Sequence, residues 1–153
     1  MKLRIYIDTS VIGGCFDEEF EIASKKLFER IKAGELIALI SELTILEIEN
    51  APENVQNVLK EIPNENLEVL KLTEEASQLA RKYIDEKVIG NGKIIDAQHI
   101  AIATIHRVDV LISWNFKHVV NLQKIRAYNS VNLKYGYQLL EIRTPWEVIT
   151  HEE

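Results

Sequence analysis

Short apolar runs alternate along this chain with segments in which apolar side chains recur at helical spacing. The runs at residues 3–7, 36–40, 67–72, 110–113 and 139–142 have the length and composition of strands. The second of these runs is apolar without alternation, which is typical of a strand covered on both faces. The pattern therefore predicts about five strands with helices between them.

The helix-period segments have start and stop signals at the expected places. Gly34 stands where a helix can end, Ser41 can cap the next helix, and Thr73 starts another. Residues 144–147 read Thr-Pro-Trp-Glu, a capping box with proline at the first helical position. Residues 114–136 are polar and rich in asparagine, and we expect loop with broken helix there. The other predicted helices occupy residues 20–31, 42–47, 52–62, 73–84 and 96–105.

Strands that alternate with helices indicate the α/β class. Right-handed crossovers would join the strands into a central, mainly parallel sheet, and helices on both faces would give a three-layer α/β/α sandwich. The sequence contains no repeat, linker or low-complexity segment. A chain of 153 residues can bury about 70% of its unfolded surface. We therefore expect one domain over residues 1–153.

Composition excludes several classes of protein. Apolar residues make up 46% and charged residues 27%, as in an ordinary globular protein. No apolar stretch approaches the roughly 20 residues that span a bilayer, and the N-terminus lacks the features of a signal peptide. The single cysteine, Cys15, excludes an internal disulfide framework and is typical of a small packed residue. We expect a cytoplasmic protein without membrane contact.

The net charge of −6 argues against a protein held to nucleic acid by its overall field. The charge is uneven, however, because residues 110–143 contain five bases and one acid. A mildly basic surface beside an acidic pocket would suit a phosphodiester substrate, and the same lysines and arginines are also compatible with an ordinary solvated surface.

Polar side chains follow several of the predicted strands. Asp8 comes directly after the first strand, Glu47 lies in the helix entered from the second, and Asn115 lies just beyond the fourth. Asp96 begins the helix that leads into the fourth strand, so topology alone does not fix its side of the sheet. Because ligands bind at the carboxyl ends of strands in open α/β sheets, these residues mark the predicted site.

The surroundings of the acids favour a divalent cation. Glu47 lies among apolar residues and Asp96 precedes an almost wholly apolar helix, with no obvious cation nearby in sequence for either. Gathered carboxylates repel unless protons or a cation neutralise them, and Mg²⁺ or Mn²⁺ prefers such oxygen ligands. Each acid also has an ordinary interpretation: Asp8 as a turn or cap residue, Asp96 as a favourable charge at a helix start, and Glu47 as a paired or solvated side chain.

Four segments resemble the PIN-domain family, and particularly its VapC-like ribonuclease toxins from toxin–antitoxin pairs. The resemblance runs from about residue 5 to residue 142. Its motifs are residues 5–10 (IYIDTS), 41–47 (SELTILE), 96–101 (DAQHIA) and 113–116 (SWNF). Each fragment alone is weak, but four in order at this spacing are fairly specific.

The resemblance implies hydrolysis of RNA phosphodiester bonds, which leaves 5′-phosphate and 3′-hydroxyl ends. Asp8, Glu47 and Asp96 would hold one or two Mg²⁺ or Mn²⁺ ions, and Ser10 would be a small polar residue of the site or a first-turn cap. Many members have an acid where this chain has Asn115, whose amide oxygen can still touch a metal or its water. The departure puts second-metal affinity, and activity itself, in question.

Residues beside these motifs have two interpretations each. His99 lies one helical turn from Asp96 and could contact substrate, but we favour a hydrogen-bonded core histidine. Lys117 and His118 could contact substrate or support the metal ligands. Trp114, Phe116 and His118 could stack on bases, but aromatic side chains at such a strand exit are more often core, and we expect core.

Our first hypothesis is a metal-dependent endoribonuclease that acts as a toxin. The resemblance implies a small cognate antitoxin and a homodimer. The second hypothesis is a non-catalytic PIN module that binds RNA or a protein partner, which Asn115 and the acidic net charge favour. A third hypothesis, a nucleotide-binding α/β domain, has little support. The sequence contains neither of the glycine-rich phosphate-binding motifs, Gly-x-Gly-x-x-Gly and Gly-x-x-x-x-Gly-Lys-Ser/Thr.

Overall fold

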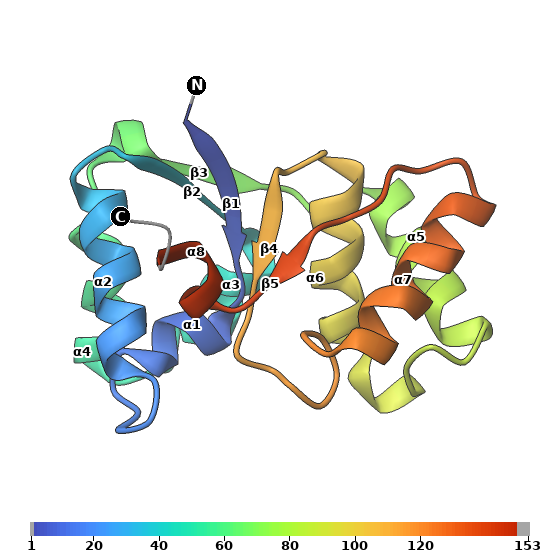
Figure 1. Ribbon diagram of the computed structural model, residues 1–153, viewed down its shortest axis with the longest axis horizontal. Coiled ribbons are helices and arrows are strands. Elements are labelled where there is room, and N and C mark those ends of the chain that lie inside the picture. Colours follow the sequence, from blue (N-terminus) through green and yellow to red (C-terminus); the bar gives the residue numbers. More distant parts are fainter. Residues whose placement is uncertain (1, 150–153) are drawn as a thin grey trace.

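The computed structural model describes residues 2–149 and has the predicted α/β architecture (Figure 1). Five strands form one sheet in the order β3-β2-β1-β4-β5, and every neighbouring pair is parallel. The prediction of a mainly parallel sheet is confirmed, and the sheet is parallel throughout. Its strands are β1 (Leu3–Ile7), β2 (Leu36–Ser41), β3 (Leu67–Leu70), β4 (Val110–Ile112) and β5 (Ile142–Arg143).

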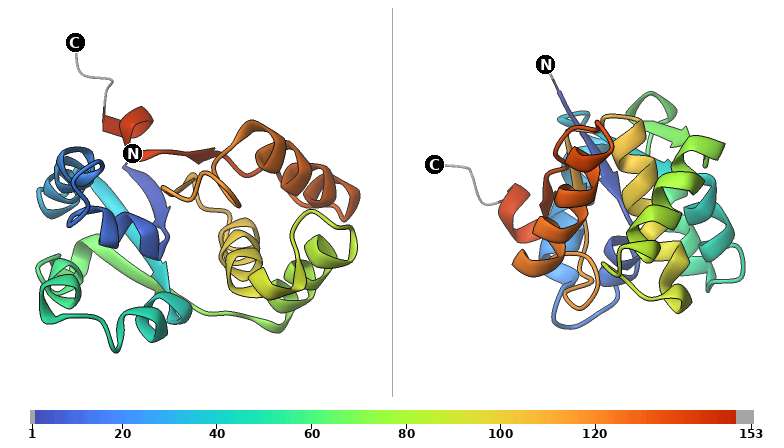
Figure 2. Two further views of the ribbon diagram at one scale, coloured as in Figure 1. Left: turned by 90° about the horizontal axis from the view of Figure 1, so that it is seen from below. Right: turned by 90° about the vertical axis from the view of Figure 1, so that its right-hand side faces the viewer.

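Helices cover both faces of the sheet, and Figure 2 shows the two groups on either side of it. One group contains α1 (Thr9–Gly14), α2 (Glu21–Lys32), α4 (Glu53–Lys60) and α8 (Pro145–Ile149). The other contains α5 (Glu74–Asp85), α6 (Ile94–Ile105) and α7 (Leu122–Lys134), while α3 (Glu42–Ile48) contributes to both cores. Short 3₁₀ turns lie at Asn64–Asn66 and Asn91–Lys93.

The central strand β1 shows why both faces must be covered. Ile5 and Ile7 enter the core beside α1 and α2, whereas Tyr6 points into the core beside α5 and α6. All three side chains are fully buried. Side chains alternate between the faces of a strand, so a strand with consecutive buried apolar residues, as at 5–7, needs a layer on each side.

The predicted end signals occupy the expected positions. Gly34 follows α2 with a φ of +79°, a left-handed conformation that costs glycine little. The Ser41 hydroxyl accepts a hydrogen bond from the Leu43 backbone at the start of α3, and Thr73 caps α5 in the same way. Within residues 2–149 no helix has the length and apolar character needed to cross a membrane.

Three elements differ from the prediction. The segment expected to be loop with broken helix contains α7, a regular helix of 13 residues. Its buried residues include Tyr128 and Asn132. Because these side chains carry polar groups, a search for apolar residues at helical spacing does not detect the buried face of this helix. The helix α1 was not predicted. The last strand, β5, has only two residues, and Leu139, predicted to lie in it, precedes it and is 63% exposed.

Candidate active site

Asp8 lies at the carboxyl end of β1 and caps α1. Its Oδ1 accepts hydrogen bonds from the Ser10 backbone at 3.1 Å and the Ser10 hydroxyl at 2.5 Å, and its Oδ2 accepts one from the Ser113 hydroxyl at 2.5 Å. Ser113 is beside it because Ile7 pairs with Ile112 across β1 and β4. Burial raises the pKa of Asp8 above its ordinary value, since these neutral donors offset the loss of water only in part.

Glu47 is held by side chains from two other helices. Its Oε1 accepts hydrogen bonds from the Thr9 hydroxyl of α1 at 2.6 Å and from Nε2 of His99 of α6 at 2.7 Å. Burial alone would raise the pKa of Glu47, but the bonds from His99 and Thr9 outweigh burial and lower it. Glu47 is therefore a carboxylate that the protein keeps ionised.

His99 is almost fully buried, and hydrogen bonds fix both of its ring nitrogens. Nε2 carries a hydrogen, because the Glu47 carboxylate can only accept. Nδ1 lies 2.6 Å from the Tyr6 hydroxyl, which in turn donates to Ser41 Oγ at 2.8 Å. This chain of contacts fixes the ring from the core side and aims it at Glu47.

Asp96 lies in the first turn of α6 and is half-buried. Burial raises the pKa of Asp96, and the negative charge of Glu47 adds to the effect, while the charges of His118, His99 and Lys93 oppose it. Among the ion pairs found in the described part of the chain, none includes Asp96 or Asp8. Neither acid is therefore paired directly with a cation among residues 2–149.

Asn115 follows β4 and lies beside Asp96. Its Nδ2 donates a long hydrogen bond of 3.5 Å to Asp96 Oδ2, and its Oδ1 accepts from the His118 backbone at 2.9 Å. His118 is part of the same turn, and burial lowers the pKa of its ring while Asp96 opposes that shift. The charges of Lys93, Lys117 and Lys124 also lower this pKa, so positive charge lies near His118.

The structure therefore brings the predicted residues to one edge of the sheet, where α1, α3, α6 and the turn after β4 meet (Figure 1). Asp96 lies near enough to Asp8 for its negative charge to raise the pKa of Asp8 further. As the side chains stand, no three His, Cys, Asp or Glu residues within 2–149 form a group that could hold a metal ion. The donors nevertheless suit Mg²⁺ or Mn²⁺ in chemistry, because they are oxygen ligands. Burial also disfavours the ionised forms of Asp8 and Asp96, which a bound cation would stabilise.

Three contacts of this site were missed by the sequence analysis. Thr9 and Ser113 donate to the acids, and Tyr6 supports His99. Ser113 could have been found, because it directly follows β4, the neighbour of the strand that Asp8 follows. The roles of Thr9 and Tyr6 depend on how α3 and α6 pack, which the local pattern does not contain.

The aromatic residues expected in the core divide into two kinds. Trp114 is 5% exposed, as expected, and its indole N–H donates to Ser24 Oγ at 2.8 Å. Phe116 is 43% exposed, so the expectation of core is wrong for this residue. It lies in the turn that leaves the sheet after β4, where its backbone N–H donates to the Trp114 carbonyl. The ring is therefore partly accessible to solvent at this turn.

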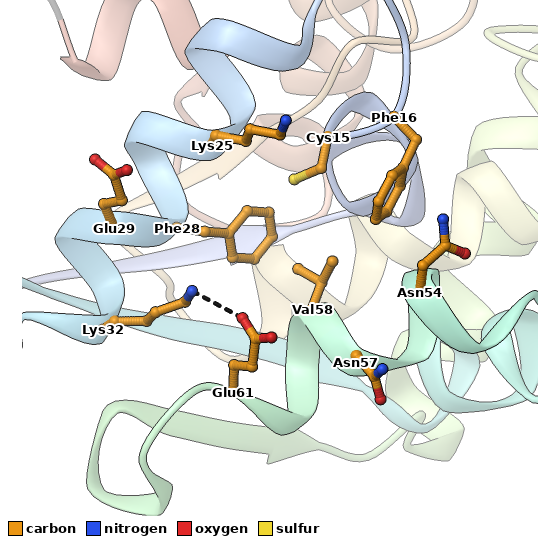
Figure 3. A pocket seen from close by; sticks show the side chains of 10 residues that line it. All are labelled: Cys15, Phe16, Lys25, Phe28, Glu29, Lys32, Asn54, Asn57, Val58 and Glu61. Atoms are coloured by element: carbon orange, nitrogen blue, oxygen red, sulfur yellow. Dashed lines mark hydrogen bonds and ion pairs between the residues drawn. The ribbon is translucent and has the colours of Figure 1, made fainter.

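A separate pocket of about 400 Å³ lies between α1, α2 and α4 (Figure 3). Its lining includes Phe28, Val58 and the ion pair between Lys32 and Glu61, but none of the candidate site residues. Cys15 also lines this pocket, and burial raises the pKa of its thiol to about 11. The thiol is therefore protonated at neutral pH and packs as an apolar group, as expected from the sequence.

Residues 5–117 match the family model of the PIN domain, and the chain belongs to the PIN-domain family. PIN domains are a family of nucleases that generally use divalent metal ions. No curated protein matches the chain.

Solved structures with the same fold include toxins of toxin–antitoxin systems. VapC20 of Mycobacterium tuberculosis, a toxin that cleaves the sarcin–ricin loop, is 11% identical with a TM-score of 0.57, over 74% of this chain and 92% of its own. A chain of a toxin–antitoxin complex from Klebsiella pneumoniae is 18% identical with a TM-score of 0.56, over 78% and 93%. A chain of FitAcB from Neisseria gonorrhoeae is 14% identical with a TM-score of 0.58, over 93% and 98%. At these identities the likeness establishes the fold.

Proposed function

We propose that this protein is a divalent-metal-dependent endoribonuclease in which Asp8, Glu47 and Asp96 hold Mg²⁺ or Mn²⁺. The observation that carries the proposal is the meeting of these three acids, from separate elements, at the carboxyl edge of a PIN-domain sheet. Burial raises the pKa of Asp8 and of Asp96, so a bound cation would stabilise the ionised carboxylates that burial disfavours. The Asn115 amide oxygen would be a further ligand to the metal or its water.

When bound, the ion would activate water and stabilise charge on the attacked phosphodiester, leaving 5′-phosphate and 3′-hydroxyl ends. The chain's own residues prepare that site. Ser10 and Ser113 orient the Asp8 carboxylate, while His99 and Thr9 keep Glu47 ionised and in place. Such supporting hydrogen bonds typically change metal affinity or activity by about 10- to 100-fold.

We further propose that the protein is the toxin of a toxin–antitoxin pair, acts in the cytoplasm, forms a homodimer and is neutralised by a small antitoxin. The VapC toxin and the toxin–antitoxin complex among its structural neighbours support this role. Lys117 and His118 would contact the phosphates of RNA, since the charges of Lys93, Lys117 and Lys124 act on His118 and are complementary to phosphate.

A second candidate function is that of a non-catalytic PIN module which binds RNA or a protein partner. Two observations favour it. Asn115 stands where many family members have an acid, and no group of three possible metal ligands is formed among residues 2–149 as the side chains stand.

The test is cleavage of an end-labelled single-stranded RNA by the purified protein. We expect cleavage with millimolar Mn²⁺, products that carry 5′-phosphate ends, and no cleavage in EDTA. Absence of cleavage by well-folded protein with Mn²⁺ or Mg²⁺, together with RNA binding retained in EDTA, would reject the nuclease and select the non-catalytic module.

A further inference from the structure

Four aromatic rings gather where the sheet meets α8: Phe20, Trp114, Phe116 and Trp146, here called the aromatic cluster. Phe20 and Trp114 are stacked with ring centroids 4.2 Å apart, and Trp146 meets Trp114 edge-on at 4.5 Å. Phe116 lies within 6.2 Å of each of the other three ring centroids. The cluster contains both tryptophans of a chain with few aromatic residues.

Only the inner part of the aromatic cluster is core. Trp114 is 5% exposed and its indole is fixed by Ser24, but Phe116 and Trp146 remain 43% and 42% exposed. These two outer rings are inclined by only 31° to one another, with centroids 6.2 Å apart. Each outer ring already packs against inner rings of the cluster, so a flat ligand could pack on its exposed part with little further ordering of side chains.

The outer rings lie on the edge of the sheet that carries the acids. Phe116 comes directly after Asn115, and the Trp114 backbone N–H donates to the Ser10 hydroxyl, which itself donates to Asp8. Trp146 lies in α8, which begins at the carboxyl end of β5, the neighbour of β4. The aromatic cluster therefore flanks the acidic site on the face covered by α2 and α8.

Positive charge lies beside the same turn. Lys117 follows Phe116 directly, and its charge, with those of Lys93 and Lys124, acts on His118 next to Asp96. Exposed ring faces next to lysines are the two components of sites for single-stranded nucleic acid: the rings take bases and the cations take backbone phosphates. An apolar partner surface would leave these lysines unmatched.

We propose that Phe116 and Trp146 form a base-stacking subsite, on which a base next to the cleaved phosphate of single-stranded RNA packs. The inference rests on the proposed function and adds to it how the substrate is positioned. Stacking on an aromatic ring tolerates any base, so the subsite would favour unpaired RNA without reading its sequence. Loss of one such ring weakens binding by about 10-fold.

The experiment measures the dissociation constant of a short fluorescent single-stranded RNA in EDTA, where no cleavage interferes. We expect Phe116→Leu and Trp146→Leu each to weaken binding by about 10-fold, and Phe116→Tyr and Trp146→Phe to restore most of it. Tyr135→Leu is the matched control, because Tyr135 is 39% exposed but lies at the end of α7 outside the aromatic cluster. It should leave the dissociation constant unchanged.

A second set of RNAs separates stacking from mere damage to the fold. Each RNA carries one abasic nucleotide, at a different position in each. When the abasic nucleotide occupies the subsite, no base remains to stack, and Trp146→Leu should no longer weaken binding of that RNA. Equal weakening with every RNA, or wild-type affinity in both leucine variants, would overturn the subsite. Cleavage by the wild-type protein is scored separately, so a nuclease without this subsite and a stacking surface without nuclease activity give different results.

Discussion

Asp96→Asn is expected to lower Mn²⁺-dependent cleavage of RNA by at least about 100-fold, the order seen when one preorganised charged or polar group is removed from an active site. Asparagine has the same size and retains one side-chain oxygen, but it has no charge to offer a divalent ion. Because burial raises the pKa of Asp96, the folded protein gains little from this charge in the absence of metal. The variant should therefore remain folded, with a melting temperature close to that of the wild type in EDTA.

Asp85→Asn is the matched control for this experiment. It is the same substitution at an exposed position at the end of α5, and it should cleave at the wild-type rate. Asp8→Asn should behave like Asp96→Asn, because it removes the charge of the other acid whose pKa burial raises. Cleavage at the wild-type rate by Asp96→Asn would remove this residue from the metal site and leave the nuclease proposal without its basis.

Two adjacent glycines of α1 should respond in opposite directions to the same substitution. A methyl group on Gly14 would lie 2.5 Å from Ser24 Oγ and 2.6 Å from Trp114 Nε1, whereas one on Gly13 would meet nothing within 4 Å. Ser24 and Trp114 are buried and hydrogen-bonded to each other, so neither can move aside. We expect Gly14→Ala to lower the free energy of unfolding by about 1–3 kcal/mol.

Gly13→Ala provides the control within the same helical turn. It should raise the free energy of unfolding by about 0.5–1 kcal/mol, because alanine loses less backbone entropy than glycine in a helix. Urea denaturation of the two variants measures both values. Equal stability of the two variants would show that α1 does not pack on Trp114 as described, and would also weaken the placement of Asp8, which caps the same helix.

The sequence predicted those parts of the fold whose signals are local. A run rich in β-branched and aromatic residues predicted β1, and an unbroken apolar run predicted β2. Gly34 and Ser41 indicated where helices end and begin. The helix α7 could not be predicted in the same way, because its buried Asn132 is satisfied by distant residues. Asn132 Oδ1 accepts from the Tyr83 hydroxyl at 2.5 Å, and such pairings depend on tertiary packing.

The candidate site was likewise predicted only where strand topology determines the position of a residue. Strand topology predicted that Asp8, Glu47 and Asn115 would share the carboxyl edge, because the carboxyl ends of parallel strands lie together. Strand topology did not determine at which edge of the sheet Asp96 lies. It also contained no information on which hydroxyl groups and rings would form hydrogen bonds with the acids. Those contacts, such as that between His99 and Glu47, arise from helices that are far apart in the sequence.

The most direct test of the metal site is a crystal structure of the protein soaked in Mn²⁺, with anomalous scattering recorded to locate the ion. We expect an anomalous peak between Asp8 and Asp96, with Glu47 bound directly or through water. The peak should be absent from crystals of Asp8→Asn treated in the same way. Wild-type crystals without a peak among these three acids, at Mn²⁺ concentrations at which the protein cleaves RNA, would contradict the account.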